Sequence, residues 1–304
     1  MAATKMKQKI ADWKANKAEC VKNYKPGSLP YVWNHIKHSR SAMFGLIVLA
    51  SLMVLSFLTP YLFKYGYREI NVRAQYTLPC LEHLFGCDEV GRDILVRVLY
   101  GAKYTLSIGI FATFGGALCG IILGAVSGYF GGFVDSLIMR FLDVFQSFPS
   151  ILLAIAIAAV LGPGYWKVIL ACGITGIPSY ARMMRANILT VRNSEYIEAA
   201  TSINCSTFRV ILRHVIPNAF SPMIVEIAMG IANAGLAASS LSFLGFGVVP
   251  PTPEWGSMLS TARTYILDYP HMVIFPGLFI MLTVLSFNLV GDALRDALDP
   301  RLRD

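Results

Sequence analysis

Long stretches without a charged residue are the feature that most limits how this chain can fold. Five windows of 23 to 31 residues contain no Asp, Glu, Lys or Arg, namely 41–63, 104–134, 144–166, 227–253 and 269–291. Because a helix needs about 20 apolar residues to cross a bilayer, each window predicts one membrane-spanning helix.

A sixth window, 168–181, is shorter and contains Pro178. It can span only if the flanking Lys167 and Arg182 extend their charged ends towards the membrane surfaces. Charged residues make up 14% of the 304 residues, compared with about 25% in soluble domains. The sequence therefore predicts an all-α, polytopic membrane protein with six transmembrane helices.

The distribution of lysine and arginine predicts which ends are cytoplasmic. Residues 1–40 hold nine of the 26, and six alternating spans place 18 of the 26 on the side of this tail. Both termini are therefore predicted to be cytoplasmic. The transmembrane domain, 41–304, then has an outer segment at about 64–100 and a large inner loop at about 182–221.

The net charge of +8 follows from this topology, and nucleic-acid binding is therefore not expected. The first apolar window begins only after residue 40, so the N-terminal segment is not expected to be a cleaved signal peptide. Two interpretations of the tail stay open. Residues 5–25 either form a basic helix on anionic lipid or remain solvated.

The sequence contains no motif that supports catalysis by this chain. Walker A, HExxH and GxSxG patterns are all absent, so no ATP-binding, metal or nucleophilic site is predicted. Ionisable residues inside the spans are few, with Glu226 at the inner end of the fifth. This is sparse for a proton- or sodium-driven carrier. A stand-alone secondary transporter or channel is the alternative from another class, and a membrane enzyme is the third.

Four glycines recur every four residues in the second span, at Gly116, Gly120, Gly124 and Gly128. On a helix this spacing forms a smooth groove that allows another helix to approach closely. The groove predicts either static packing or a helix interface that slides.

The inner loop contains a polar stretch that reads EAATSINCSTFRVILRHVIPN, from residue 198 to 218. Ser194 is a good N-cap, so a short helix is predicted over about 195–203. Asn204 can take the left-handed conformation that ends a helix. A second helix is predicted over 208–216 and is expected to end at Pro217. The pair is either a docking element or an ordinary interfacial loop.

Several stretches of this chain resemble the dipeptide/oligopeptide permeases of ABC importers, in their shorter subunit type. They are GCDEVGRDILVRVLYGA (86–102), SGYFGGFVDSLIMRFLDV (127–144), SYARMMRANIL (179–189), LSFLGFGVVPPTPEWGSML (241–259) and FPGLFIMLTVLSFNLVGDALRDALDPR (275–301). The polar stretch resembles the EAA loop of that family, and "EAA loop" is used below for residues 182–221.

The resemblance implies the type I importer architecture, in which six spans pair with a second permease in a bacterial inner membrane. It also implies two cytosolic ATPases that bind ATP and Mg²⁺, and an extracytoplasmic binding protein; this chain itself has no cofactor or metal. The implied substrates are di- or oligopeptides, with nickel complexes, glycosides or other solutes as the alternative.

Carried over by position, the resemblance places the ATPase-coupling tip at Glu198, Ala199 and Ala200. The residues expected to support this tip are Tyr196, Arg209 and Pro217. The family has glycine where this chain has Asn204. Since asparagine tolerates a positive φ, the bend is expected to survive.

The outer segment contains a compact charged cluster. Three acids and one cation lie within six residues, at Asp88, Glu89, Arg92 and Asp93, beside Gly86 and Gly91. Arg92 can pair with Asp88 or Asp93 and hold the loop together. The cluster either serves as an outer gate that receives the binding protein or only stabilises the fold.

Two cysteines of the outer segment, Cys80 and Cys87, are seven residues apart. Cys87 stands where the family has threonine. The sequence leaves open whether these two form a disulfide or remain free thiols.

Overall fold

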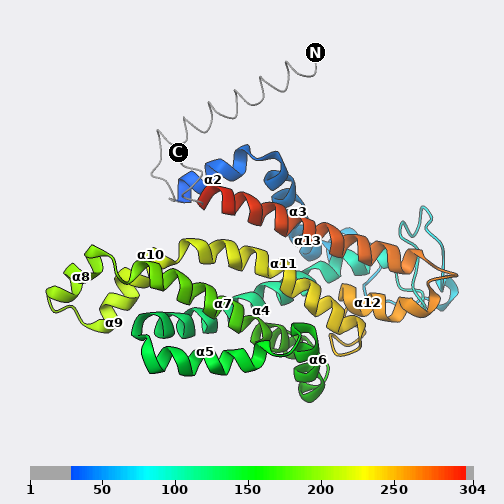
Figure 1. Ribbon diagram of the computed structural model, residues 1–304. Helices are drawn as coiled ribbons and strands as arrows, with labels where there is room; N and C mark the ends of the chain where they lie inside the picture. The colour runs from blue at the N-terminus through cyan, green and yellow to red at the C-terminus, as the bar shows by residue number, and fades with distance from the viewer. Residues whose placement is uncertain (1–28, 299–304) are drawn as a thin grey trace, which may run out of the picture.

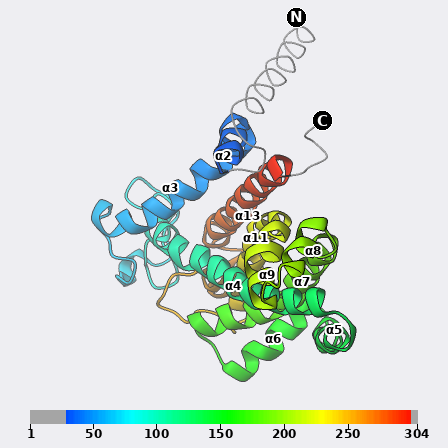
Figure 2. The same ribbon diagram turned by 90° about the vertical axis from the view of Figure 1, so that its left-hand side faces the viewer.

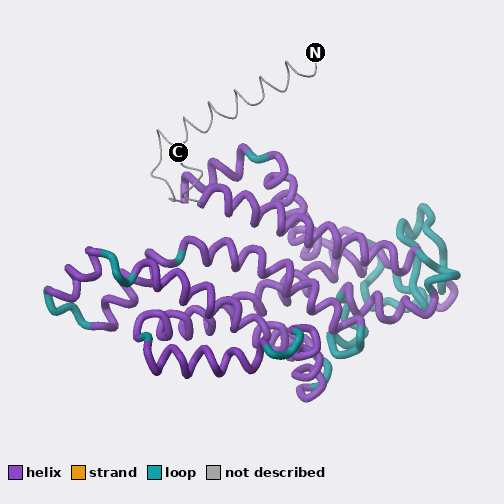
Figure 3. Tube along the Cα trace, in the orientation of Figure 1, coloured by secondary structure: helices purple, strands orange, loops and turns teal. Residues whose placement is uncertain are grey.

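The computed structural model describes residues 29–298, and every regular element in this range is a helix (Figures 1 and 3). The elements are α2 (Leu29–His38), α3 (Arg40–Leu62), η1 (Val72–Ala74), α4 (Ile94–Phe130), α5 (Gly132–Gln146), α6 (Ser150–Leu161), α7 (Tyr165–Val191), α8 (Glu195–Ser202), α9 (Thr207–Val210), η2 (Ile211–Val215), α10 (Ile216–Ala219), α11 (Ser221–Phe243), α12 (Trp255–Ala262), η3 (Arg263–Tyr265) and α13 (His271–Leu298). The all-α prediction is confirmed. The two interpretations of residues 5–25 fall outside the described residues.

Within residues 29–298, four helices are long and apolar enough to cross a membrane, namely α3, α4, α11 and α13. The bent pair of α5 and α6 makes a fifth if it crosses as one unit. Helix α7 contains the sixth window and is 27 residues long, but it is not among these spans. Because α4, α5, α6 and α11 pack around α7, it can carry polar residues that face other helices. The polytopic prediction is confirmed, and the count of six remains a prediction compatible with this arrangement.

The window 144–166 does not form one straight span. Helix α5 ends at Gln146, α6 begins at Ser150, and the two helices are bent by 86°. Pro149 occupies the N-cap of α6, where it has no N–H to extend the hydrogen bonding of the preceding helix. The prediction of a single helix across this window is therefore wrong.

The four glycines spaced along α4 lie against α7. A Cβ added to Gly116 would lie 2.6 Å from the carbonyl oxygen of Gly173, and one added to Gly124 would lie 2.3 Å from that of Ala181. The other two glycines of the series also face α7. The predicted close packing is confirmed, and sliding of the two helices stays a prediction.

The two ends of the molecule carry different structures (Figure 1). Helices α8 and α9 project at one end, whereas the loops between α3 and α4 lie at the other end with α12. In the view turned by 90° (Figure 2), α3 and α13 lie on one side of the molecule, and α5 and α6 lie on the other. The EAA loop and the outer segment are thus at opposite ends of the long helices, as alternating spans require.

Candidate functional site

The Glu-Ala-Ala stretch lies on α8, which begins after Ser194 in an extended conformation. Glu195 and Glu198 occupy its first turn, where acidic side chains interact favourably with the helix dipole. The helix predicted over 195–203 is confirmed to within one residue.

Asn204 ends α8 with a φ of 60°. Its main-chain N–H donates to the carbonyl oxygen of Thr201 (2.9 Å), and the N–H of Cys205 donates to that of Ala200 (3.2 Å). These two bonds form a Schellman motif, a helix ending that usually has glycine in the left-handed position. The predicted conformation of Asn204 is confirmed.

Helix α8 has one buried and one exposed face. Ile197 and Ala200 are buried in a cluster with side chains of α4 and α7. Glu198 and Ala199 are exposed, as is Tyr196. Two of the three Glu-Ala-Ala residues are therefore available to a partner, and the third anchors the helix.

The second helix of the EAA loop was predicted to end at Pro217, and this prediction is wrong. After α9, a π-helical turn (η2) leads directly into α10, and Pro217 lies in the first turn of α10. Proline is tolerated there because the N–H that it lacks would have no partner within the helix. Val210 and Val215 are buried, and Arg209 and Pro217 are exposed.

Two exposed apolar side chains flank the turn at Asn204. Ile203 exposes 79% of its surface and Phe208 exposes 74%. Large apolar groups gathered on a surface mark a contact site. Neither residue is among the coupling residues predicted from the sequence. Their position beside the turn predicted at Asn204 could have indicated that they are exposed.

Arginine contacts hold the base of the EAA loop. Helix α7 continues through the first ten residues assigned to the inner loop. From α7, Arg185 donates two hydrogen bonds of 2.6 Å to Asp135 of α5. Arg192 donates from Nη1 to the carbonyl oxygen of Gly128, near the end of α4 (2.9 Å). These contacts connect the base of the loop, at the end of α7, to α4 and α5.

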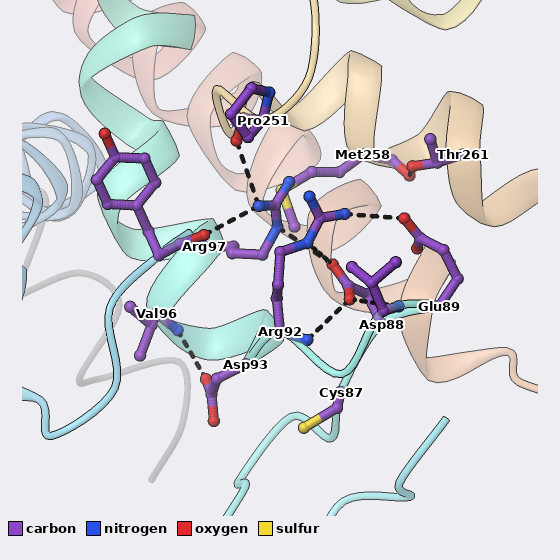
Figure 4. A network of polar contacts seen from close by, with 12 residues as sticks. Cys87, Asp88, Glu89, Arg92, Asp93, Val96, Arg97, Pro251, Met258 and Thr261 are labelled. Carbon is purple, nitrogen blue, oxygen red and sulfur yellow. Dashed lines mark hydrogen bonds and ion pairs between the residues drawn. The ribbon is translucent and has the colours of Figure 1, made fainter. Parts of the chain in front are cut away.

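At the other end of the molecule, Asp88 is the centre of a buried polar network (Figure 4). Its Oδ2 accepts from Arg92 Nε (2.6 Å), and its Oδ1 accepts from the main-chain N–H of Arg92 (2.9 Å) and of Val90 (3.1 Å). Arg92 also donates to Glu89 (2.8 Å). The sequence offered Asp88 or Asp93 as the partner of Arg92, and in the structure Arg92 pairs with Asp88.

Arg97 of α4 joins this network to a segment far away in the sequence (Figure 4). Its Nε lies 3.5 Å from Asp88 Oδ2, and its Nη1 donates to the carbonyl oxygens of Tyr67 (3.0 Å) and Pro251 (3.3 Å). Sequence reasoning missed Arg97 because two of its partners are main-chain oxygens, which no residue pattern shows. The contact fixes the outer segment against the loop that precedes α12.

Asp93 and the two glycines of the cluster shape the outer segment. Asp93 caps α4 by accepting a main-chain hydrogen bond (2.9 Å), and its Oδ2 lies 2.8 Å from His83 Nδ1. Gly86 and Gly91 have positive φ angles of 74° and 77°. A Cβ on Gly91 would lie 1.8 Å from the carbonyl oxygen of Asn71. These contacts belong to a cluster that stabilises the fold, and a role as an outer gate stays a proposal.

Cys80 and Cys87 are free thiols, so of the two alternatives the structure has the second. Cys80 is exposed, and its Sγ accepts a hydrogen bond from the main-chain N–H of His83 (3.4 Å). Cys87 is completely buried, and this burial raises its pKa to about 12. Residues 29–298 contain no group of three or more His, Cys, Asp and Glu side chains that could hold a metal ion.

Glu254 is a second structural residue that sequence reasoning missed. Its carboxyl group is fully buried and accepts from the main-chain N–H of Gly256 (3.0 Å) and Ser257 (2.9 Å), which caps α12. The hydroxyl of Ser239 on α11 also donates to it (3.3 Å). Burial raises the pKa of this carboxyl group. Glu254 is a single acid that directly follows the charge-free window 227–253, and this position could have indicated a capping role.

Comparison with known proteins connects this geometry to a family. The family of binding-protein-dependent transport system inner membrane components matches residues 120–304, and the N-terminal TM domain of oligopeptide transport permease C matches residues 30–79. The chain is 42% identical over 271 residues to the dipeptide transport system permease protein DppC of Alkalihalophilus pseudofirmus, with 89% of each chain covered. It is 44% identical over 277 residues to the glutathione transport system permease protein GsiD of Escherichia coli, which covers 89% of this chain and 90% of that protein.

The fold is also found in a solved transporter. The inward-facing MetNI methionine ABC transporter superposes with a TM-score of 0.54 at 16% identity, over 67% of this chain and 96% of that chain. At this identity the likeness concerns the fold alone, which is that of a type I ABC-importer permease. Together with the family matches, it shows that this chain belongs to the peptide ABC-transporter permeases among the binding-protein-dependent transport system inner membrane components.

Proposed function

We propose that this permease carries di- or oligopeptides into a bacterial cell, as one of two similar permeases that enclose the path. An extracytoplasmic binding protein delivers the peptide, and two cytosolic ATPases bind ATP and Mg²⁺. The relatives named for dipeptide and glutathione transport support a peptide substrate. The ends of α2 and α13 lie away from the outer segment (Figure 1), which supports cytoplasmic termini.

The coupling role of the EAA loop is the central part of this proposal. The observation that carries it is the exposed surface at the tip, where Glu198 and Ala199 lie on the same short helix pair as Ile203 and Phe208. Such a surface suits insertion into a groove of an ATPase, with apolar side chains supplying contact area and Glu198 supplying charge. The anchoring of the loop base to α4, α5 and α7 would transmit the movement.

The experiment that tests coupling is Glu198→Lys in the complete importer, reconstituted in liposomes with its binding protein. We expect peptide uptake to fall about tenfold or more, equivalent to roughly 1.4 kcal/mol of lost contact free energy, while the complex still hydrolyses ATP. Glu69→Lys is the matched control, since Glu69 is an exposed acid of the outer segment. Uptake by Glu198→Lys at the control rate would contradict the coupling role.

The same liposomes distinguish an importer from a stand-alone transporter or channel. The isolated chain should move no peptide, and the complete complex should move it only with ATP and the binding protein. ATP-independent uptake by the isolated chain would show that the rival function is correct.

A further inference from the structure

A cavity whose mainly apolar walls contain several polar side chains opens among the helices, away from both surfaces described above. Its volume is about 220 Å³, and its walls come from α4, α6, α7 and α11. The residues that determine its chemistry are Thr113, Ser179, Asn233 and Glu226. None of these side chains has a part in the coupling surface or in the outer network.

Glu226 gives the cavity its charge. It is the one charged residue among the cavity's lining, and the hydroxyl of Ser179 donates to its Oε1 (3.3 Å). Arg182 follows Ser179 by one turn on α7, but it pairs with Asp143 (2.8 Å) and does not line the cavity. The cavity therefore has an acidic group with no basic partner within its walls.

Thr113 provides a second polar group. Its side chain is almost completely buried, and its hydroxyl lies next to that of Tyr180 on α7, another residue of the cavity wall. The amide of Asn233, exposed on α11, adds both a donor and an acceptor to the same cavity.

We propose that this cavity receives a positively charged amino group of the transported solute, with Glu226 as its counter-ion. The inference rests on the proposed peptide import and adds that the free amino terminus of the peptide enters this chain. A protonated amine offers three N–H donors, which match the acceptors of Glu226, Ser179 and Asn233. An ionisable residue inside a transport protein is the usual marker of the substrate path.

The size of the cavity limits what it holds. Ligand sites usually measure about 300–1,000 Å³, so about 220 Å³ accommodates one end of a peptide. The remainder of the peptide lies outside these walls. The cavity therefore recognises the charged amino group common to peptides, and the side chains are left to other parts of the importer.

The cavity is mechanically connected to the coupling loop. Ser179 lies on α7, which continues into the EAA loop and ends at Val191, about 18 Å further along the helix at 1.5 Å per residue. A movement of α7 that follows the loop changes the distance between Ser179 and Glu226 of α11. The affinity of the cavity for the amino group therefore depends on whether the ATPases have moved the loop.

The charge of the cavity can be measured without knowledge of the substrate. In the complete importer with Ser179→Cys, residue 179 is reacted with a cationic and with an anionic methanethiosulfonate of similar size, and modification is followed by peptide mass mapping. We expect the cationic reagent to react at least tenfold faster. Adding Glu226→Gln should reduce this ratio about tenfold. If the cationic and anionic reagents react at equal rates in the protein that retains Glu226, the proposal is overturned. That comparison does not depend on whether a Glu226 variant folds.

A transport measurement provides the second test of the amino-group site. Liposomes with the complete importer are given a mixture of alanyl dipeptides, and the imported peptides are quantified by mass spectrometry. We expect Glu226→Gln to reduce uptake at least tenfold, Glu226→Asp to retain most of it, and Glu69→Gln in the outer segment to match the wild type.

The outcomes separate this inference from the function on which it rests. Wild-type uptake by Glu226→Gln would overturn the amino-group site and leave peptide import intact. A wild-type importer that takes up no peptide would overturn peptide import itself, while the reagent rates would still report the charge of the cavity.

Discussion

The main-chain N–H of Cys205 donates to the carbonyl oxygen of Ala200 at 3.2 Å, which closes the end of α8 around Asn204. This bond fixes the angle between the two short helices of the EAA loop. It also places Ile203 and Phe208 on the surface, on either side of the turn. The geometry of the proposed coupling tip therefore depends on a left-handed backbone conformation at one residue.

Replacing Asn204 tests this dependence. Asn204→Gly should keep full transport, because glycine adopts a positive φ without strain. Asn204→Val should destabilise the turn by about 1–2 kcal/mol, because a β-branched side chain opposes the left-handed conformation. ATP-driven uptake in liposomes measures both variants. A glycine variant that assembles but does not transport would show that the asparagine side chain itself is needed.

The packing of α4 on α7 allows a matched pair of glycine substitutions. Gly124→Ala places a Cβ 2.3 Å from the carbonyl oxygen of Ala181, so it should lower the free energy of unfolding by about 1–3 kcal/mol. Gly115→Ala on the same helix meets nothing within 4 Å and should be neutral or stabilising by up to about 1 kcal/mol. Thermal unfolding of the purified complex compares them. Similar melting temperatures for the two variants would refute the close contact.

The thiols of the outer segment should differ in reactivity. Cys80 is exposed, whereas Cys87 is buried and its pKa is raised from 9.0 to about 12, so its thiolate fraction at pH 8 falls by about 1,000-fold. We expect alkylation of the native protein to modify Cys80 and spare Cys87. Alkylation after unfolding without a reductant should modify both. A mass that is lower by two hydrogen atoms would reveal a disulfide instead.

Glu254 should make stability depend on pH. Because burial raises its pKa above the usual 4.5, the folded state binds this proton more tightly than the unfolded state does. The resulting stabilisation is fully present below about pH 4.5 and is lost as the pH rises through the folded pKa. Melting temperatures measured from pH 4.5 to 8 should fall less steeply for Glu254→Gln than for the wild type. Glu69→Gln, which changes an exposed acid, should keep the wild-type slope, and identical slopes for all three proteins would contradict this account.

The features predicted from sequence are those with local causes. The long apolar windows gave the helices because each must satisfy its own backbone hydrogen bonds in lipid. The sequence at 194–204 predicted α8 and its left-handed ending, since both depend on contacts within a few residues. The predicted capping by Ser194 is not found, because its hydroxyl donates to the carbonyl oxygen of Val191 (2.6 Å) and makes no hydrogen bond to α8. The glycine spacing on α4 likewise predicted a close helix contact, although it did not identify α7 as the partner.

The tertiary structure decided what depends on contacts between distant segments. Helix α7 extends past Arg182 because Arg182 and Arg185 find acids on α5, which a hydropathy window cannot reveal. The role of Arg97 depends on main-chain oxygens up to 154 residues away, and the cavity around Glu226 depends on the packing of four helices. The sequence alone determined that the chain is a bundle of membrane helices with a capped polar loop. Only the packing of those helices decided which polar side chains are paired and which face an open cavity, because pairing depends on distances that residue order does not set.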